Sequence, residues 1–430
     1  PASWQHPAIG HRDRAEDGAF VKPLRDAQRE IMAGLPVLES IDVPLAAAAG
    51  LVLAEPIAAP HDVPPFPNSA MDGYAVRAGD LVTVPAELRV IADLPAGDIA
   101  SEPVESGTAI KIMTGAPLPP GADTVVQVEH TVPAGSSVRI LRSHPAGTAV
   151  RRAGEDMAQG DVVLEPGLRL DATRLGVLAT LGITDVPVRR ARVAVMSTGD
   201  ELVSPAEPEP APGKIRDSNR VVLAELLRDV GAEVLDYGIV GDDHRRLRAA
   251  LLDAADEADA VLSSGGVSMG DYDLVKQVLG ELGGVEVWKV AMKPGKPSAF
   301  GRIAGKPFFG LPGNPVSVFV AFEQFVRPAI LSMTGASRHF RPRLPGVMAS
   351  AVRSTEEREE FVRVTTEQVA GEWTARPSGG QGSHVLSALA AADAFAVIPS
   401  GVAQVDAGAV VELEMFRWPE ARTATEVLGE

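Results

Sequence analysis

The sequence predicts an α/β multidomain protein with a doubly wound α/β domain, a β-rich inserted domain, a composite helical/β domain and a C-terminal β-barrel domain. Three observations lead to this prediction. Short apolar runs alternate with helical patterns between about residues 191 and 335, as in a parallel sheet with crossover helices. Residues 68–152 are rich in Pro, Gly and Val and offer few stretches of helix length. The 430 residues also exceed the roughly 250–300 at which a single core stops growing.

The elements of the doubly wound region follow one another in a regular order. RVAVMSTG is expected to be a strand that runs into a loop, and DSNRVVLAELLRDVG a helix with Asp217, Ser218 or Asn219 as its N-cap and Gly231 as its stop. The next expected elements are the strand EVLDYGIV, the helix DDHRRLRAALLDAADEA, the strand ADAVLSSGG, the helix DLVKQVLGELG and, after FFGLPGNP, a long apolar helix over Val316–Met333. Ligands of such sheets bind at the carboxyl ends of the strands.

The flanking regions show other patterns. The alternating runs EFVRVTTEQV, FAVIPSG and VVELEMF predict a compact antiparallel barrel or sandwich. Helical patterns in residues 22–60 and 153–190 are expected to pair into one domain, which makes the β-rich region an insertion. The predicted boundaries are a disordered N-terminus at 1–21, the composite domain at 22–67 and 153–190, the insertion at 68–152, the doubly wound domain at 191–335, the barrel at 336–420 and a tail at 421–430.

Composition excludes several classes of function. Without cysteine the chain has no disulfide, thiolate zinc site, iron–sulfur cluster or cysteine nucleophile. A net charge of −17 argues against nucleic-acid binding, which needs a basic surface. No uninterrupted apolar run approaches the roughly 18 residues of a membrane span, and the N-terminal residues do not resemble a signal peptide. We expect a soluble, cytoplasmic protein.

The segment SSGGVSMGD follows a predicted strand and precedes a helix. Its backbone N–H groups could converge on a phosphate, which makes Ser264, Gly265, Gly266 and Ser268 candidates for ligand binding. It has neither the Walker pattern nor the spacing of dinucleotide-binding folds. The alternative is that the glycines only turn the chain.

Two further loops are expected beside this segment. KPGKPSAFG carries Lys293 and Lys296 on a proline-stiffened loop, which suits an oxyanion or phosphate; solvated lysines are the alternative. GLPGNP has a tightly specified backbone, and it either forms a structural turn or contributes to the floor of a pocket. Its candidate residues are Pro312, Gly313, Asn314 and Pro315.

Acidic residues follow several of the predicted strands. The carboxylates expected around this edge of the sheet are those of Asp200, Glu201, Asp242, Asp243, Asp271 and Asp273. Gathered there they would repel one another, so we expect Mg²⁺ between them and ligand phosphates; solvated loop acids are the alternative. Asp72 and Thr114 lie in loops bounded by Gly and Pro, so the local sequence alone predicts that they are turn residues.

Taken together, these motifs resemble one family. PPFPNSAMDGYAVR, IKIMTGAPLPPGAD, RRAGEDMAQGD, STGDEL, IRDSN, SSGGVSMGDYDLVK, KPGKPSAFG and GLPGNPVSVF occur in the order and approximate spacing of MoeA, the molybdopterin molybdenumtransferases, whose eukaryotic relatives include the gephyrin E domain. The resemblance extends from about Lys22 to Phe416. It implies four domains, with a MogA-like doubly wound domain, and an elongated homodimer whose sites combine this domain of one subunit with the insertion of the other.

The resemblance also implies a reaction. Family members use adenylyl-molybdopterin and molybdate as substrates, hydrolyse the phosphoanhydride with Mg²⁺ and release AMP, leaving molybdenum on the pterin dithiolene. The missing cysteines are consistent with this chemistry, because the sulfur ligands belong to the cofactor. The choice between molybdate and tungstate stays open, because the two oxyanions have the same charge and a similar size. A MogA-type adenylyltransferase would be a partner.

The resemblance leaves a second function open. Relatives of this family also act as scaffolds, so a gephyrin-like scaffold could bind a cytoskeletal, cell-division or membrane-protein tail through the C-terminal domain and the dimer interface, alone or as a second role. A nucleotide-binding regulator without turnover is disfavoured, because acids and lysines gather as phosphoanhydride cleavage would need.

Most of the implied site residues lie in these motifs, whereas Arg358 and Ser383 match family positions in the less distinctive C-terminal domain. Asp72 and Thr114, with Asp156, resemble the residues that reach the partner's site. The predicted catalytic residues are Asp72, Thr114, Glu201, Asp242, Asp273, Lys293 and Lys296. The predicted metal ligands are Glu201, Asp242, Asp243 and Asp273, where the second of the two adjacent aspartates is also a natural N-cap. The predicted cofactor-binding residues are Asp217, Asn219, Ser264, Gly265, Gly266, Ser268, Pro312, Gly313, Asn314, Pro315, Arg358 and Ser383.

Overall fold

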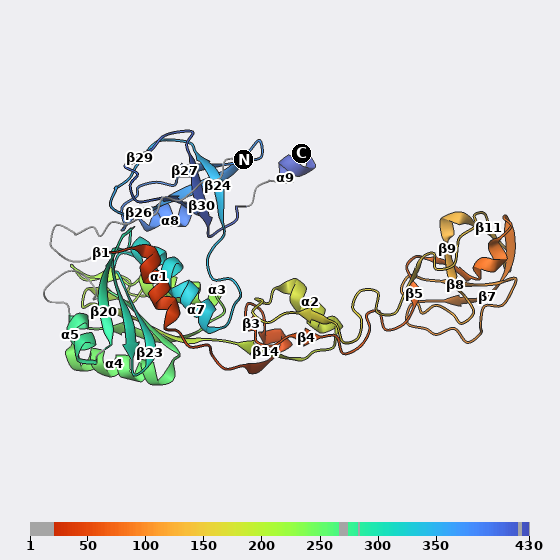
Figure 1. The fold of residues 1–430 in the computed structure, drawn as a ribbon, viewed down its shortest axis with the longest axis horizontal. Helices are drawn as coiled ribbons and strands as arrows, with labels where there is room; N and C mark the ends of the chain where they lie inside the picture. Colours follow the sequence, from red (N-terminus) through yellow and green to blue (C-terminus); the bar gives the residue numbers. More distant parts are fainter. Residues whose placement is uncertain (1–20, 266–273, 283, 420–423, 430) are drawn as a thin grey trace.

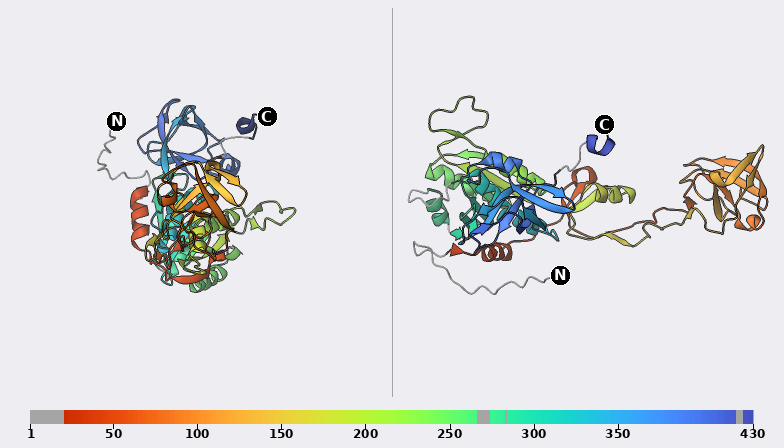
Figure 2. Two further views of the ribbon diagram at one scale, coloured as in Figure 1. Left: turned by 90° about the vertical axis from the view of Figure 1, so that its right-hand side faces the viewer. Right: turned by 90° about the horizontal axis from the view of Figure 1, so that it is seen from above.

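The molecule is elongated, with a β-rich end joined to the rest through a narrow middle region (Figures 1 and 2). The computed structural model describes residues 21–265, 274–282, 284–419 and 424–429. The other end carries a helix-covered sheet and a small β-barrel side by side. The α/β multidomain class expected from the sequence is confirmed.

The doubly wound region contains a seven-stranded sheet in the order β1-β20-β22-β23-β19-β15-β18. Its strands are β1 (Val21–Lys22), β15 (Arg192–Thr198), β18 (Glu233–Val240), β19 (Ala260–Ser264), β20 (Val285–Val290), β22 (Pro297–Ile303) and β23 (Lys306–Leu311). Neighbouring strands from β23 to β18 are parallel, whereas β22 is antiparallel to both of its neighbours. The sheet is therefore mixed, because Ala304 and Gly305, both at positive φ, turn β22 directly into β23.

Helices cover both faces of this sheet. They are α3 (Asn219–Asp229), α4 (His244–Glu257), α5 (Leu274–Leu282), α6 (Pro315–Ala321), the π-helical η4 (Phe322–Val326) and α7 (Arg327–Met333). Leu223 and Leu227 of α3 join one core, and Leu247 and Leu251 of α4 join a second. The continuous helix Pro315–Met333 is long and apolar enough to cross a membrane, but 89% of its apolar window is buried inside the protein, as in a core helix.

One helix lies away from its expected place. The sequence grouped α1 (Leu24–Ala33) with the composite domain, but β1 pairs with β20 and α1 contacts α7 on the seven-stranded sheet. Leu24, Ala27 and Ile31 recur at helical spacing and are buried in the same core as α3. This apolar stripe directs the helix to the sheet.

The narrow middle region is built from two distant segments. Its elements are β2 (Ile41–Pro44), η1 (Leu45–Ala47), β3 (Val52–Leu53), β4 (Ile57–Ala58), β13 (Val162–Leu164), α2 (Ala172–Thr180) and β14 (Asp185–Arg189). Strand β14 lies between β2 and β3, and β13 pairs with β4. Val43 and Leu53 share one core with Leu178 and Val186.

The inserted region forms the β-rich end of the molecule (Figure 1). Its sheet has the order β10-β11-β7-β8-β6-β9. The elements here are β5 (Asn68–Ser69), β6 (Gly73–Val76), η2 (Ala78–Leu81), β7 (Ala86–Leu94), β8 (Thr108–Ile112), β9 (Thr124–Gln127), η3 (Val128–His130), β10 (Thr131–Ala134), β11 (Ser137–Ile140) and β12 (Val150–Arg151). Pairing of β5 with β12 brings the two connecting chains together where the insertion begins and ends.

The C-terminal region is a closed barrel, as the sequence predicts, but it is not wholly antiparallel, because β24 and β27 pair in parallel. Its elements are β24 (Arg343–Met348), β25 (Val352–Arg353), β26 (Glu359–Val369), β27 (Glu372–Pro377), α8 (Leu386–Ala391), β28 (Ala394–Ile398), β29 (Gln404–Val405), β30 (Val410–Met415) and, beyond the barrel, α9 (Ala424–Leu428). Five of these strands close in the circular order β26-β27-β24-β30-β28. Strand β21 (Met292–Lys293) leaves the sheet domain and pairs with β26, so it ties the two domains together.

Candidate functional site

Three neighbouring strands of the sheet end at one place. Ser197 of β15 lies opposite Ser264 of β19, which lies opposite Leu311 of β23. The loops that follow these strands are therefore adjacent, as expected for ligand sites of parallel sheets. The short strands β16 (Leu202–Val203) and β17 (Ile215–Arg216) form an arm between the first of these loops and α3.

Asn219 connects the loops. Its Nδ2 donates to Ser264 Oγ at 2.8 Å and to the carbonyl oxygen of Gly313 at 2.7 Å. Its Oδ1 is buried and has no hydrogen-bond partner among the described residues. One side chain at the start of α3 thus joins the serine-rich loop to the GLPGNP turn and leaves an acceptor for a ligand.

Asp217 acts inside the protein. It is 1% exposed; its Oδ1 accepts from Ser197 Oγ at 3.0 Å and from the Arg220 N–H at 3.2 Å, and its Oδ2 accepts from Arg220 Nε at 3.0 Å. Arg220 also forms an ion pair with Asp236. These bonds hold the first turn of α3, where Asn219 lies, and the ligand contact of Asp217 stays a prediction.

The start of the serine-rich loop requires a glycine. Gly265 has a φ of 93°, and a Cβ there would come within 2.6 Å of the carbonyl oxygen of Thr198. Its N–H donates to the carbonyl oxygen of Leu311 at 3.1 Å and so is not directed at a ligand. Gly266 and Ser268 of this segment, and the predicted carboxylates Asp271 and Asp273, lie outside the described residues, so the phosphate cradle stays a prediction.

Two carboxylates interlock beside this edge. Asp200 Oδ1 accepts the N–H of Asp242 at 3.0 Å, and Asp242 Oδ2 accepts the N–H of Asp200 at 3.3 Å. Lys214 Nζ donates to the carbonyl oxygen of Asp200. Asp243 instead caps α4, since its Oδ1 accepts the Arg246 N–H at 2.8 Å. The structure therefore separates the two adjacent aspartates into a loop acid and a helix cap.

The same loops supply hard oxygen donors. A Cβ on Gly199 would come within 2.4 Å of the Glu201 carboxylate, so this carboxylate lies back over its own loop near Asp200. Carboxylate oxygens are the ligands that Mg²⁺ prefers. Within the described part of the chain no three His, Asp or Glu side chains are close enough together to hold a metal by themselves. Asp273 is not in that part.

Lys293 lies at the junction with the barrel. Its Nζ is 3.1 Å from Glu360 Oε1, and the nearly buried Glu360 also accepts from Ser354 Oγ at 2.8 Å. Both Lys293 and Lys296 were expected to project from a loop. Lys293 instead belongs to β21 and forms an ion pair with Glu360. Lys296 is half-buried, and no side-chain partner for it is found among the described residues.

The barrel contributes a loop to the same region. The N–H of Val316, in the first turn of α6, donates to the carbonyl oxygen of Ser383 at 3.1 Å. This contact brings Ser383 next to the Asn314–Pro315 end of the GLPGNP turn. Arg358 has a buried Nε without a hydrogen-bond partner among the described residues.

A buried arginine holds this loop in place. Arg363 is 1% exposed, and its Nη2 donates to the carbonyl oxygens of Gly380 at 2.9 Å and Gly382 at 3.2 Å. Burial lowers the pKa of its guanidinium. Sequence analysis missed this residue, as it missed Arg220 and Glu360. The signal was a charged residue within an otherwise apolar strand, FVRV, which usually has a specific partner.

Asp72 and Thr114 lie at the other end of the chain. Asp72 Oδ1 accepts from both the backbone N–H and the Oγ1 of Thr114, each at 2.7 Å, and these bonds lower the pKa of the Asp72 carboxyl. The two residues adjoin β6 and β8 of the inserted domain, far from the sheet domain in Figure 1. Asp156 lies in the connection between them, where its N–H donates to the carbonyl oxygen of Val63 at 3.0 Å.

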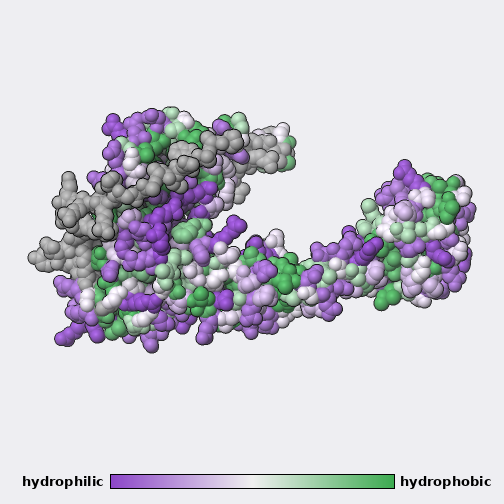
Figure 3. All heavy atoms as spheres, in the orientation of Figure 1, coloured by the Kyte–Doolittle hydropathy of each residue, from purple (hydrophilic) through white to green (hydrophobic). Residues whose placement is uncertain are grey.

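The space-filling view shows the shape and the hydropathy of one face of the molecule. The visible face is concave between the barrel and the inserted domain, and hydrophilic residues gather where the barrel meets the sheet domain (Figure 3). The polar loops of the candidate site belong to this meeting of two domains, while the Asp72–Thr114 pair belongs to the distant end. A single chain brings the two sets to opposite ends of its long axis.

Comparisons with known proteins cover almost the whole chain. Family models match in three parts: the MoeA N-terminal region (domain I and II) at residues 22–182, a probable molybdopterin binding domain at 194–332 and the MoeA C-terminal region (domain IV) at 345–416.

Full-length relatives agree with these matches. Molybdopterin molybdenumtransferase 2 of Mycobacterium tuberculosis is 40% identical over 404 residues, covering 91% of this chain and 99% of the relative. Molybdopterin molybdenumtransferase of Haemophilus influenzae is 38% identical over 400 residues, covering 91% and 98%. The crystal structure of a molybdopterin biosynthesis moeA protein from Pyrococcus horikoshii OT3 superimposes with a TM-score of 0.79 at 33% identity, over 92% of this chain and all of that one. The chain therefore belongs to the MoeA family.

Proposed function

We propose that this chain is a molybdopterin molybdenumtransferase, which inserts molybdate into adenylyl-molybdopterin and gives Mo-molybdopterin and AMP. In this reaction water adds across the phosphoanhydride, so that one P–O bond breaks and AMP leaves, while the two dithiolene sulfurs form Mo–S bonds and the molybdate oxygens that they replace leave as water. The observation that carries the proposal is the link from Asn219 to Ser264 and Gly313, beside the interlocked Asp200 and Asp242, in a chain of this family. In this proposal the loops linked by Asn219 anchor the pterin nucleotide, and the carboxylates of Asp200 and Asp242 lie near its phosphates.

The proposed roles follow from charge. Lys293, Lys296 and Arg358 offset the charge of phosphate and molybdate at the barrel junction, where the unpartnered Nε of Arg358 is a donor for an oxyanion. Glu201 and Asp242, with Asp273, would hold Mg²⁺, which would neutralise charge on the phosphoanhydride. Ser383 is positioned by Arg363 to face the same ligand.

The proposed active unit is a homodimer. Asp72 and Thr114 lie far from the sheet domain of their own chain, and a second copy could bring its inserted domain there. Each site would then combine Asn219, Asp242 and Lys293 of one subunit with Asp72 and Thr114 of the other. The Thr114 bonds keep Asp72 ionised for this role.

The remaining proposals concern the surroundings of the enzyme. We place it in the cytoplasm, supplied by a MogA-type adenylyltransferase that makes its nucleotide substrate. The scaffold function that the sequence left open receives no support from the relatives reported above, which are named as transferases. We do not propose it.

The test is reconstitution with purified protein. With adenylyl-molybdopterin, molybdate and Mg²⁺, we expect AMP release together with molybdenum bound to the pterin, each dependent on molybdate. The matched variants are Asn219→Ala within the proposed site and Glu225→Gln on the exposed face of α3, and only the first should form less of both products when adenylyl-molybdopterin is limiting. Folded protein that releases no AMP under these conditions would refute the proposed activity.

The shared site has its own test. Asp72→Ala and Asp242→Ala chains should each be nearly inactive alone. Subunit exchange between them should restore about a quarter of the sites, because half of the chains enter mixed dimers and each mixed dimer has one intact site. No recovery after verified exchange would contradict a site built from two subunits.

A further inference from the structure

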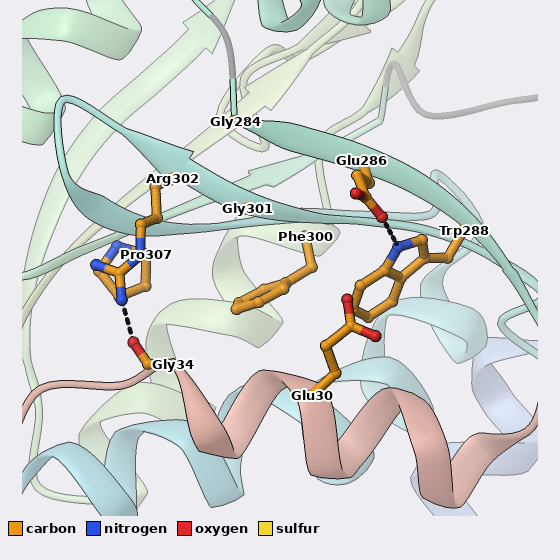
Figure 4. A pocket seen from close by; sticks show the side chains of 9 residues that line it. All are labelled: Glu30, Gly34, Gly284, Glu286, Trp288, Phe300, Gly301, Arg302 and Pro307. Atoms are coloured by element: carbon orange, nitrogen blue, oxygen red, sulfur yellow. Dashed lines mark hydrogen bonds between the residues drawn. The ribbon is translucent and has the colours of Figure 1, made fainter.

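A pocket lies at the end of the seven-stranded sheet that is opposite to the candidate site. It has a volume of about 210 Å³ and lies between α1 and the strands β20 and β22 (Figure 4). Its lining includes Gly284, just before β20, and Pro307, at the start of β23, whereas β23 reaches the candidate site only at Leu311. The pocket is therefore separate from the site described above.

One end of the pocket is acidic and aromatic. Glu30 from α1 and Glu286 from β20 both line it, and Glu286 Oε2 accepts from Trp288 Nε1 at 2.9 Å. The chain's own ammonium group already occupies the neighbouring position: Lys22 Nζ lies 2.6 Å from Glu30 Oε2 and 3.6 Å from the centre of the Trp288 ring. A primary ammonium is thus stabilised here by a carboxylate and a ring face, while Glu286 has no cation partner among the described residues.

The other end is cationic. Arg302 donates through Nη1 to the carbonyl oxygen of Gly305 at 2.7 Å and through Nη2 to that of Gly34. Both partners are neutral, and among the described residues Arg302 has no carboxylate partner. These two bonds fix the guanidinium beside the end of α1 and leave its charge for an anion.

An apolar floor separates the two ends. Phe300 lies between Arg302 and Trp288 in Figure 4, with its ring centre 5.6 Å from that of Trp288. The strand register places Glu286 opposite Phe300 and Arg302 two residues further on. The Cα atoms of diagonal neighbours of this kind are about 7–8 Å apart, so the acidic and the basic side chain lie on one face of the sheet within reach of one small ligand.

We propose that this pocket binds an ω-amino carboxylate: a primary ammonium and a carboxylate at the two ends of a short unbranched apolar chain. The ammonium lies at Glu286 and Trp288, the carboxylate at Arg302, and the methylene groups on Phe300. The same chemistry comes from a free ω-amino acid or from the C-terminal lysine of a peptide. The binding site is independent of the transferase reaction.

The test is calorimetric titration of the full chain with 6-aminohexanoate. We expect saturable binding in the millimolar range or tighter, and at least tenfold weaker binding of hexylamine and of hexanoate, which each lack one charge. Glu286→Gln and Arg302→Gln should each weaken binding about tenfold, while the same changes in the exposed pair on α3, Glu225→Gln and Arg228→Gln, should not.

Two further arms complete the experiment. Lys22→Met removes the competing ammonium and should tighten binding of 6-aminohexanoate. If Arg302→Gln unfolds the protein, Phe300→Leu provides a second variant, which should weaken binding without a change of charge. An N-acetylated peptide that ends in lysine should compete if the source is peptidic, and its amidated form should not. Equal binding of all three six-carbon compounds, or no saturable binding to folded wild-type protein, would overturn the proposal.

Discussion

Asp200 and Asp242 each accept the backbone N–H of the other, at 3.0 Å and 3.3 Å, so two loops that follow different strands are fastened by a reciprocal pair of bonds. The neighbouring Asp243 is bound to the first turn of α4 instead. This difference yields a prediction for two adjacent residues of the same type.

Asp242→Ala should lower kcat by about 100-fold or more, because it removes a carboxylate from the proposed Mg²⁺ site. Its effect on stability should be small, since the pair is exposed. Asp243→Ala should retain most activity but lose about 1 kcal/mol of unfolding free energy with the helix cap. Kinetics at several Mg²⁺ concentrations and urea unfolding of both variants check this. If Asp243→Ala lost activity and Asp242→Ala kept it, the metal ligand would be Asp243.

Asn219→Ala should raise the KM for the pterin nucleotide at least tenfold, because the loop of Ser264 and the turn of Gly313 lose their common donor. Two lost hydrogen bonds predict a destabilisation of about 1–3 kcal/mol. Steady-state kinetics and thermal unfolding give the two values. Ser264→Ala removes one of the two contacts and should have the smaller effect on both; a larger one would show that Ser264 acts on the ligand directly.

The fold was predictable where local pattern and burial agree. Leu223 and Leu227, like Leu247 and Leu251, recur at helical spacing, and the structure buries all four against the predicted sheet. The antiparallel strand β22 was not predicted, because its cause is a two-residue turn at Ala304 and Gly305 with no strong sequence signal. The position of α1 depends on which of several apolar surfaces it meets, and periodicity does not encode that choice.

Prediction of the site has a similar limit. The strand–loop–helix order brings Asn219, Ser264 and Gly313 to one edge, and their contacts follow from that order. The partner of Lys293 comes from another domain, and no pattern around Lys293 indicates Glu360. Likewise, the sequence did not separate Asp242 from Asp243, because their contacts differ only through the path of the backbone into α4. Side-chain pairing across domains therefore required the structure.

The pair formed by Lys293 and Glu360 allows structure and catalysis to be separated. Lys293→Met leaves a nearly buried carboxylate with Ser354 as its remaining hydrogen-bond donor, and should cost about 1 kcal/mol, a modest value because Lys293 is partly exposed. Adding Glu360→Gln should recover that stability. If Lys293 also binds the anion, the double variant stays inactive. Chemical unfolding and the AMP-release assay on single and double variants measure both effects, and recovered activity would limit Lys293 to a structural role.

The last prediction concerns the pKa of Asp72. Two hydrogen bonds from Thr114 lower this pKa in the folded protein, so the stabilisation that they provide is present above the ordinary pKa of an aspartate and is lost as pH falls through the lowered value. Thr114→Val removes the hydroxyl donor but keeps the backbone N–H, and should move the Asp72 pKa part of the way back up. A carboxyl-carbon NMR titration of both proteins measures the shift, with the Asp72→Asn spectrum to assign the signal. Thr114→Ser, which keeps the donor, should titrate like the wild type. An unchanged pKa in Thr114→Val would show that the backbone N–H alone holds Asp72 ionised.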